Sequence, residues 1–193
     1  MTDQTIEQDK QQLIFAATLA VISERGFHDS PVSVIAKRSG VSPGTIYHYF
    51  ENKDDLIHAL FWKIETAFAA ALMAGDPQAE PWPDHLEHIW LNAFAFYVAH
   101  PEETLFLEQY KNSPYQKDAF ILPDSDEIHR LMALIEADQQ NGVMQRLPIE
   151  VLHELTLGVA VRLAKRQIAG AIDLDQSELA NIARSCVRAV AVG

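Results

Sequence analysis

The amino-acid sequence predicts an all-α fold of nine helices. Apolar residues recur at spacings of three and four along the chain, and the alternation of apolar and polar residues typical of β-strands is absent. Proline and glycine residues interrupt the pattern where helices would begin and end. A chain of 193 residues is long enough for one sizeable core, or for a small domain joined to a larger one.

The first two helices are predicted from the residues at their ends. The first is expected from Thr5 to Arg25, because Gly26 provides a C-terminal stop. The second is expected to begin after Ser30 as N-cap and to end at Gly40. Both carry apolar residues at helical spacing, so each can pack one face against a core.

The third helix is short and is expected to follow Ser42 as N-cap, with Pro43 in its first turn. Ile46 and Phe50 are four residues apart and are therefore expected to face the core. The residues left on the outer face are Thr45, Tyr47, His48 and Tyr49.

The remaining helices are expected over residues 52–74, 84–99, 101–110, 125–142, 148–169 and 176–192. A proline-rich connection over 75–84 separates the first two of these, and residues 111–123 are expected to form a loop. We expect residues 1–55 to form a helix-turn-helix domain and residues 56–193 a larger helical domain.

Charge is distributed unevenly along the chain. The formal net charge is −12, which by itself argues against a nucleic-acid-binding protein. Residues 25–53, however, carry four basic side chains against two acidic ones, and the acidic excess lies mostly after them. Any contact with a phosphate backbone is therefore expected within 25–53.

Composition excludes several other classes of protein. The polar N-terminus has no secretory signal pattern, and no apolar run approaches the roughly 18 residues that span a bilayer. A single cysteine, Cys186, rules out an internal disulfide framework. We therefore expect a cytoplasmic protein without a membrane partner.

No enzyme motif is present in the sequence. It lacks a Gly-x-Ser-x-Gly elbow, a glycine-rich phosphate loop and a His-Glu-x-x-His helix, so no catalytic residue and no cofactor are predicted. His85 and His88 lie three residues apart on one predicted helix and can in principle share a metal ion. Spacing fixes no third ligand, so no metal site is predicted, and metal sensing stays open as an alternative.

Two short helices joined by the residues SGVS make a helix-turn-helix, in which the second helix protrudes while the first braces it. Hydroxyl, phenol and imidazole groups on its outer face suit phosphate oxygens and thymine methyls in a major groove. Pro43 and Gly44 have little bulk, so the helix N-terminus can approach the DNA backbone closely. The alternative is that Tyr47 and Tyr49 pack against neighbouring helices of the same chain.

Residues 14–56 contain the string AATLAVISERGFHDSPVSVIAKRSGVSPGTIYHYFENKDDL, which resembles the N-terminal domain of the TetR family of transcriptional regulators. The resemblance implies that Thr45, Tyr47 and His48 contact bases and phosphates, and that Tyr49 and Lys53 contact phosphates. Pro31 departs from the threonine that is common in the family. The residues predicted to bind DNA are Ser33, Lys37, Ser42, Pro43, Gly44, Thr45, Tyr47, His48, Tyr49 and Lys53.

The same resemblance implies a homodimer that reads a palindromic double-stranded operator, with recognition helices about 34 Å apart or a multiple of that distance. The last two helices are rich in small and branched apolar residues that allow close approach of a second copy. The predicted interface consists of Leu155, Val159, Leu163, Leu179, Ile182, Ala183 and Cys186. The alternative is that these faces cover the chain's own core.

Finally, the resemblance implies a repressor that a small-molecule effector releases from DNA. Large rings in the middle helices suit an apolar or aromatic effector, although each ring could equally fill a packed core. The predicted effector pocket consists of Trp62, Phe94, Tyr97, Phe106 and Tyr110.

Overall fold

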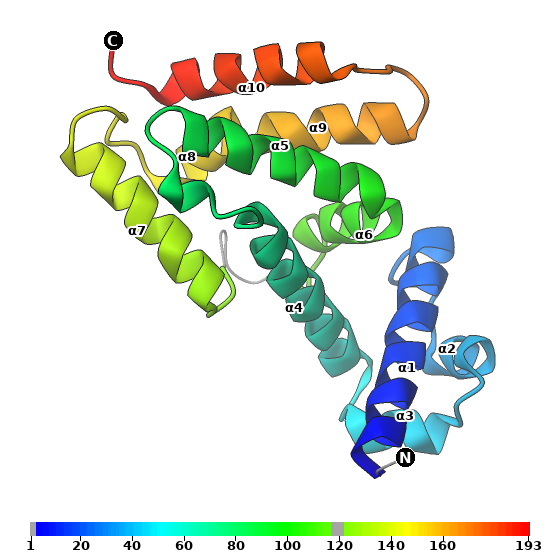
Figure 1. The fold of residues 1–193 in the computed structure, drawn as a ribbon. Coiled ribbons are helices and arrows are strands. Elements are labelled where there is room, and N and C mark those ends of the chain that lie inside the picture. The colour runs from blue at the N-terminus through cyan, green and yellow to red at the C-terminus, as the bar shows by residue number, and fades with distance from the viewer. Residues whose placement is uncertain (1–2, 117–121) are drawn as a thin grey trace. The chain divides into compact units, whose positions relative to one another are not determined.

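The structure is a computed structural model that describes residues 3–116 and 122–193, with side chains described from residue 7 onward in these ranges. Helices joined by turns account for the described residues, apart from an isolated bridge between Met144 and Ala191 (Figure 1). The predicted all-α fold is confirmed. The helices are α1 (Asp3–Arg25), α2 (Val32–Ser39), α3 (Pro43–Tyr49), α4 (Lys53–Leu72), the 3-10 turn η1 (Pro77–Ala79), α5 (Asp84–Ala99), α6 (Pro101–Lys111), α7 (Asp126–Gln140), α8 (Ile149–Leu155), α9 (Leu157–Ile168) and α10 (Gln176–Val190).

The helix predicted over 148–169 is divided into α8 and α9 at Thr156. The Thr156 hydroxyl donates to the Leu152 carbonyl over 2.7 Å, and the Trp90 indole N–H donates to the Thr156 carbonyl over 3.1 Å. Counted as one interrupted helix, the pair gives the expected nine α-helices among the described residues. The loop predicted over 111–123 includes residues 117–121, which lie outside the described residues.

The chain forms two compact units. The N-terminal unit comprises Met1–Ile64 and Leu105–Ala119, and the C-terminal unit comprises Glu65–Thr104 and Phe120–Gly193. The sequence-based division after residue 55 places the boundary at the start of α4, whereas these units divide the chain within α4 and again within α6. Residues 105–116 thus belong to the N-terminal unit, although the other part of that unit ends about 40 residues earlier, at Ile64.

The core of the N-terminal unit is formed by α1, α2, α3, the first part of α4 and the second half of α6. The buried isoleucines at 14, 22, 35 and 46 meet in it together with Leu56. Gly40 ends α2 with a φ of 69°, a left-handed conformation that a residue with a Cβ adopts only at a cost, and this allows the tight turn into α3.

The prediction that Ser30 caps α2 is wrong. Pro31 occupies the N-cap position and makes no side-chain capping bond, while the buried Ser30 hydroxyl donates to the Gly26 carbonyl over 2.6 Å. Ser30 therefore closes the turn after α1. A serine before a proline supports either role in sequence, and burial of the hydroxyl decides between them.

The core of the C-terminal unit is built around α5, which packs against α9 and α10. Trp90 and Phe94 stack with ring centroids 5.8 Å apart and nearly parallel planes. Ala160, Ala164 and Ala183 are completely buried in the same cluster, where their small side chains permit close helix packing.

Two residues of the predicted dimer interface are already covered by the folded chain. Ala183 is completely buried and Cys186 is 6% exposed, and both belong to the core cluster around α5. The seven-residue interface is corrected accordingly, because a side chain that packs inside its own subunit has little surface left for a second copy. The five other residues remain at least partly exposed.

The Cys186 thiol is expected to react slowly in the folded protein. Burial raises its pKa, which a hydrogen bond with Trp90 offsets only in part, so little thiolate forms near neutral pH. We expect a disulfide reagent such as DTNB to react at least about 100-fold more slowly with the native protein than with protein in concentrated urea. Equal rates would show that this part of the core opens freely.

One segment, residues 53–79, is long and apolar enough to cross a membrane by length and composition alone. More than half of its most apolar window is buried inside the protein. The core helix of a folded protein has the same composition, and its burial here accounts for its apolar character.

Candidate nucleic-acid interface

The start of α3 is fixed by local hydrogen bonds. The Ser42 hydroxyl oxygen accepts from the Thr45 backbone N–H over 3.1 Å and lies 2.8 Å from the Thr45 hydroxyl. Pro43 occupies the first turn, and Ile46 is buried on the inner face. The predicted cap and inner face are thus present, and they determine which side chains point away from the core.

The outer face of α3 is largely open. Tyr47 is 53% exposed and His48 is exposed, as are Pro43 and Gly44 at the helix start. Tyr49 is half-buried: it packs against the N-terminal core, and its ring lies 5.5 Å from that of His48. The alternative of packing within the chain therefore applies in part to Tyr49, but Tyr47 stays available for an external contact.

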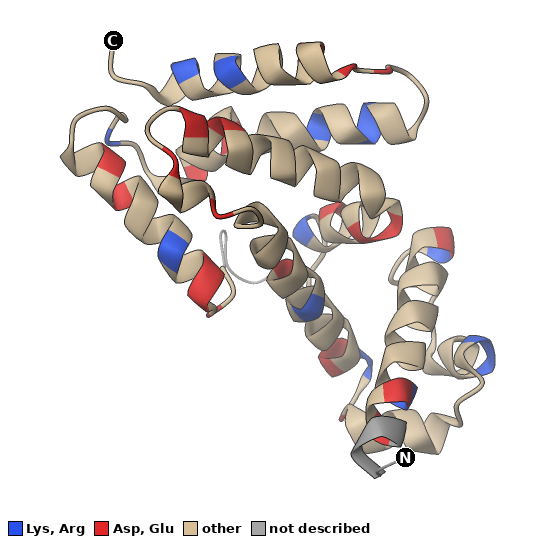
Figure 2. Cartoon of the chain, viewed as in Figure 1, with Lys and Arg blue, Asp and Glu red and all other residues tan. Residues whose placement is uncertain are grey.

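No Lys, Arg, Asp or Glu occurs on α3, and basic side chains lie on the neighbouring helices instead (Figure 2). Lys37 and Ser33 are exposed on α2, whereas Arg38 forms an ion pair with Glu24 of α1 over 2.6 Å. The two side chains are 43% and 49% exposed, so water solvates the pair and its contribution to stability is small. An uncharged outer face flanked by cations can donate hydrogen bonds to bases while the flanks contact phosphates.

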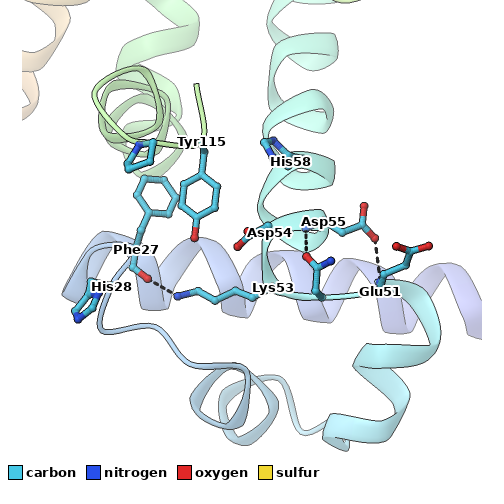
Figure 3. A pocket seen from close by; sticks show the side chains of 10 residues that line it. Phe27, His28, Glu51, Lys53, Asp54, Asp55, His58 and Tyr115 are labelled. Atoms are coloured by element: carbon cyan, nitrogen blue, oxygen red, sulfur yellow. Dashed lines mark hydrogen bonds between the residues drawn. The ribbon is translucent and has the colours of Figure 1, made fainter. Parts of the chain in front are cut away.

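Lys53 at the start of α4 is half-buried and its ammonium donates to the Phe27 carbonyl in the turn after α1 (Figure 3). Burial lowers the pKa of Lys53, and the charges of Asp54 and Asp29 partly oppose this. Because an ammonium has three N–H donors, the bond to Phe27 leaves donors for a phosphate oxygen. The contact also ties α4 to the end of α1.

An open hollow of about 750 Å³ lies beside Lys53 in the N-terminal unit. Figure 3 shows the Tyr115 ring beside Phe27, with the carboxylates of Asp54 and Asp55 close to the start of α4. Its lining residues are Phe27, His28, Glu51, Asn52, Lys53, Asp54, Asp55, His58, Pro114 and Tyr115. None of the five residues predicted to bind an effector lines this hollow.

The predicted effector residues are divided between the two units. Phe94 and Tyr97 are buried in the core of the C-terminal unit, whereas Phe106 and Tyr110 are buried in the core of the N-terminal unit. Trp62 is partly exposed on α4. Burial, and to a lesser extent the charge of Glu65, strongly raise the pKa of Tyr97, so its hydroxyl stays protonated.

The two histidines of the metal-sensing alternative have different partners. His85 Nε2 lies 2.8 Å from Asp138 Oδ2, and His88 Nδ1 lies 3.0 Å from Glu80 Oε1. Over residues 7–116 and 122–193, no group of three or more histidine, cysteine or acidic side chains is placed to hold a metal ion. The geometry thus supports two separate structural pairs.

The residues left from the predicted dimer interface lie on α8, α9 and α10. Leu155 is 38% exposed. The other four residues are half-buried: Val159, Leu163, Leu179 and Ile182.

Sequence reasoning missed the contribution of residues 105–116 to the N-terminal unit. Tyr115 packs against Phe27 and His58, with ring centroids 5.1 and 5.9 Å apart, respectively. Tyr110 stacks on Phe61 at 4.0 Å. Aromatic residues at the end of a helix indicate that the segment packs in a hydrophobic core. They do not indicate whether that core belongs to the N-terminal or the C-terminal unit.

Two models of known protein families match the chain. A family model described as "Bacterial regulatory proteins, tetR family" matches residues 14–60, and one described as "Tetracyclin repressor-like, C-terminal domain" matches residues 81–191. The second match covers more than half of the chain.

Individual relatives agree with these matches. An uncharacterized HTH-type transcriptional regulator from Haemophilus influenzae is 28% identical over 156 residues, covering 81% of this chain and 82% of the relative. The crystal structure of a TetR family transcription regulator from Marinobacter aquaeolei superposes with a TM-score of 0.83, at 22% identity and with 97% and 98% of the two chains covered. The fatty acid metabolism regulator protein of Bacillus subtilis is 49% identical, but only over 55 residues, or 28% of each chain.

Proposed function

The chain belongs to the TetR family of transcriptional regulators, and from that premise we propose that it is a homodimeric repressor released from a palindromic operator by a small-molecule effector. Proteins of this family are DNA-binding regulators that usually act as dimers, and they are not enzymes. The proposal places this regulator in the cytoplasm, where its operator would be.

The observation that carries the proposal is the exposed, uncharged outer face of α3. A capped helix with its N-terminal turn open, one exposed tyrosine and one exposed histidine matches what major-groove contact requires. We assign base and phosphate contacts to this face and phosphate contacts to Lys37 and Lys53. The remaining predicted contacts are Ser33, Ser42, Pro43, Gly44, Thr45 and Tyr49.

We place the dimer interface on α8, α9 and α10. Leu155 and its half-buried neighbours Val159 and Leu163 supply apolar area that a second copy would cover. An isologous contact of this kind joins two copies of α3 by two-fold symmetry, which a palindromic operator requires. Ala183 and Cys186 support these helices from inside.

We place the effector in the C-terminal unit, next to the aromatic cluster that contains Phe94 and Tyr97. Glu65 is buried near Tyr97, so a ligand that reaches this cluster would meet one acidic group among rings. An apolar or aromatic effector fits this environment. The likeness to the fatty acid metabolism regulator is limited to 55 residues, so it does not bear on effector chemistry.

Measuring the affinity for DNA from the promoter beside the gene at several salt concentrations tests the proposal. Two phosphate-contacting lysines per subunit make four per dimer, so the slope of log K against log salt is expected to be about −4. Fluorescence anisotropy with labelled operator and with scrambled DNA gives both the slope and the specificity.

Two outcomes would contradict the proposed function. Equal affinity for operator and scrambled DNA would remove sequence-specific recognition. A monomer at concentrations where operator binding is saturated, measured by analytical ultracentrifugation, would remove the dimer.

A further inference from the structure

The segment that follows α6 is built into the N-terminal unit by side-chain contacts. Tyr115 stands between Phe27 and His58, and it stacks at 6.4 Å on Tyr110 with nearly parallel rings. The Ser113 hydroxyl donates to the Tyr110 carbonyl over 2.7 Å and accepts from the Tyr115 backbone N–H over 3.2 Å. These bonds fix the turn that carries Tyr115.

Tyr110 also contacts α4, through His58 and Phe61. His58 Nδ1 lies 2.7 Å from the Tyr110 hydroxyl, and Tyr110 itself stacks on Phe61. His58 and Phe61 are three residues apart on α4, so Tyr110 and Tyr115 together contact its second and third turns. Their contacts bind α4 to a segment about 50 residues later in the chain.

The Tyr115 hydroxyl points toward the Asp54 carboxylate, and the Lys53 side chain passes below it to the Phe27 carbonyl (Figure 3). Burial, followed by the charge of Asp54 and a hydrogen bond with it, raises the pKa of Tyr115. The hydroxyl therefore stays protonated and able to donate to Asp54. Tyr115 thus contacts Asp54 in the first turn of α4, and Lys53 in the same turn contacts Phe27 in the turn after α1.

The turn between α3 and α4 is hydrogen-bonded to Asp55, which lies next to Asp54 in the first turn of α4. The Asp55 carboxylate accepts from the Glu51 backbone N–H over 3.0 Å, and Asn52 Oδ1 accepts from the Asp55 backbone N–H over 2.9 Å. A displacement of the first turn of α4 would therefore also displace the end of α3.

We propose that Tyr115 is a positioning residue for DNA recognition, which holds the first turn of α4, and with it Lys53 and the α3–α4 turn, in the arrangement that contacts DNA. The proposal rests on the proposed function, since it concerns how the DNA-contacting residues are held. Tyr115 itself need not touch DNA. Its effect passes through Asp54 to Lys53.

Hydrogen exchange provides a test that does not require DNA. In Tyr115→Ala, the Glu51 and Asp55 amides are expected to exchange about tenfold faster than in Asn112→Ala, while amides in the middle of α1 keep their protection. Asn112→Ala is the matched control because Asn112 is exposed just after α6 and its side-chain amide donates to the Glu108 carbonyl near the end of that helix. Unchanged exchange at 51 and 55 would overturn the proposal.

Operator affinity provides the functional test. Tyr115→Phe keeps the ring and removes the hydroxyl, so we expect about fivefold weaker binding and a melting temperature lowered by at most a few degrees. In a Lys53→Met background the same substitution is expected to have a clearly smaller effect, because one of the two features that Tyr115 positions is gone. If the two substitutions reduced operator affinity independently, so that their fold-changes multiplied in the double variant, Tyr115 would not act through Lys53.

These measurements separate the two proposals. If the native protein shows no operator preference, the proposed function fails, while faster exchange at 51 and 55 in Tyr115→Ala would still assign Tyr115 its positioning role. If the native protein binds the operator and Tyr115→Phe binds equally well, the positioning role fails alone.

Discussion

Replacing Tyr47 by alanine should weaken operator binding about thirtyfold or more and leave the melting temperature of the protein unchanged. Tyr47 is 53% exposed on the outer face of α3, so its ring contributes little to the core. A side chain that contacts a base or phosphate contributes about 1–3 kcal/mol, and a dimer makes each such contact twice. The change in affinity is measured by anisotropy at fixed salt, and stability by thermal unfolding.

Val192→Ala is the matched control for this substitution. Val192 is 52% exposed and lies in the C-terminal unit, so its truncation removes a similarly exposed apolar surface away from α3. Tyr47→Phe separates the hydroxyl from the ring, since it keeps contact with a thymine methyl but loses a donor to phosphate. If Tyr47→Ala bound the operator as tightly as the Val192→Ala control, α3 would not be the recognition helix in the sense proposed here.

The parts of the fold that follow from local rules could be predicted from the sequence. Ser42 caps α3, Ser125 caps α7 by accepting from the Ile128 N–H, and Asn52 accepts from the Asp55 N–H at the start of α4. Each of these interactions joins residues three apart, so four consecutive residues of the sequence are enough to predict the start of the helix. The exposed face of α3 follows in the same way from the i, i+4 pair on its inner face.

Contacts between distant segments could not be predicted in this way. Tyr110 and Tyr115 pack in the N-terminal unit, although the α-helical pattern around them fits either unit equally well. Cys186 lies on an apolar face that could cover its own core or a second copy, and only the packing of α10 on α5 decides this. Periodicity shows that a face is buried, whereas the partner that buries it depends on the whole chain.

Replacing Asp138 by alanine should lower the free energy of unfolding by about 3 kcal/mol. His85 and Asp138 are 2% and 6% exposed, and His85 Nε2 lies 2.8 Å from Asp138 Oδ2. No hydrogen-bond partner of His85 Nδ1 occurs among the described residues, so loss of the carboxylate would leave a buried imidazole without any strong contact. Urea unfolding followed by tryptophan fluorescence measures the difference.

Asp124 and His129 provide a matched control, because they form the same kind of pair on the surface. Their separation is 3.1 Å, but the two side chains are 94% and 68% exposed, so water already solvates both and Asp124→Ala should cause no measurable loss. Replacing both buried partners, as in His85→Leu with Asp138→Leu, should recover part of the stability lost in Asp138→Ala, because no polar group is then left unpaired. If Asp138→Ala were as stable as Asp124→Ala, the buried pair would not contribute to the free energy of unfolding. The unpaired His85 Nδ1 would then have to be solvated in the native protein.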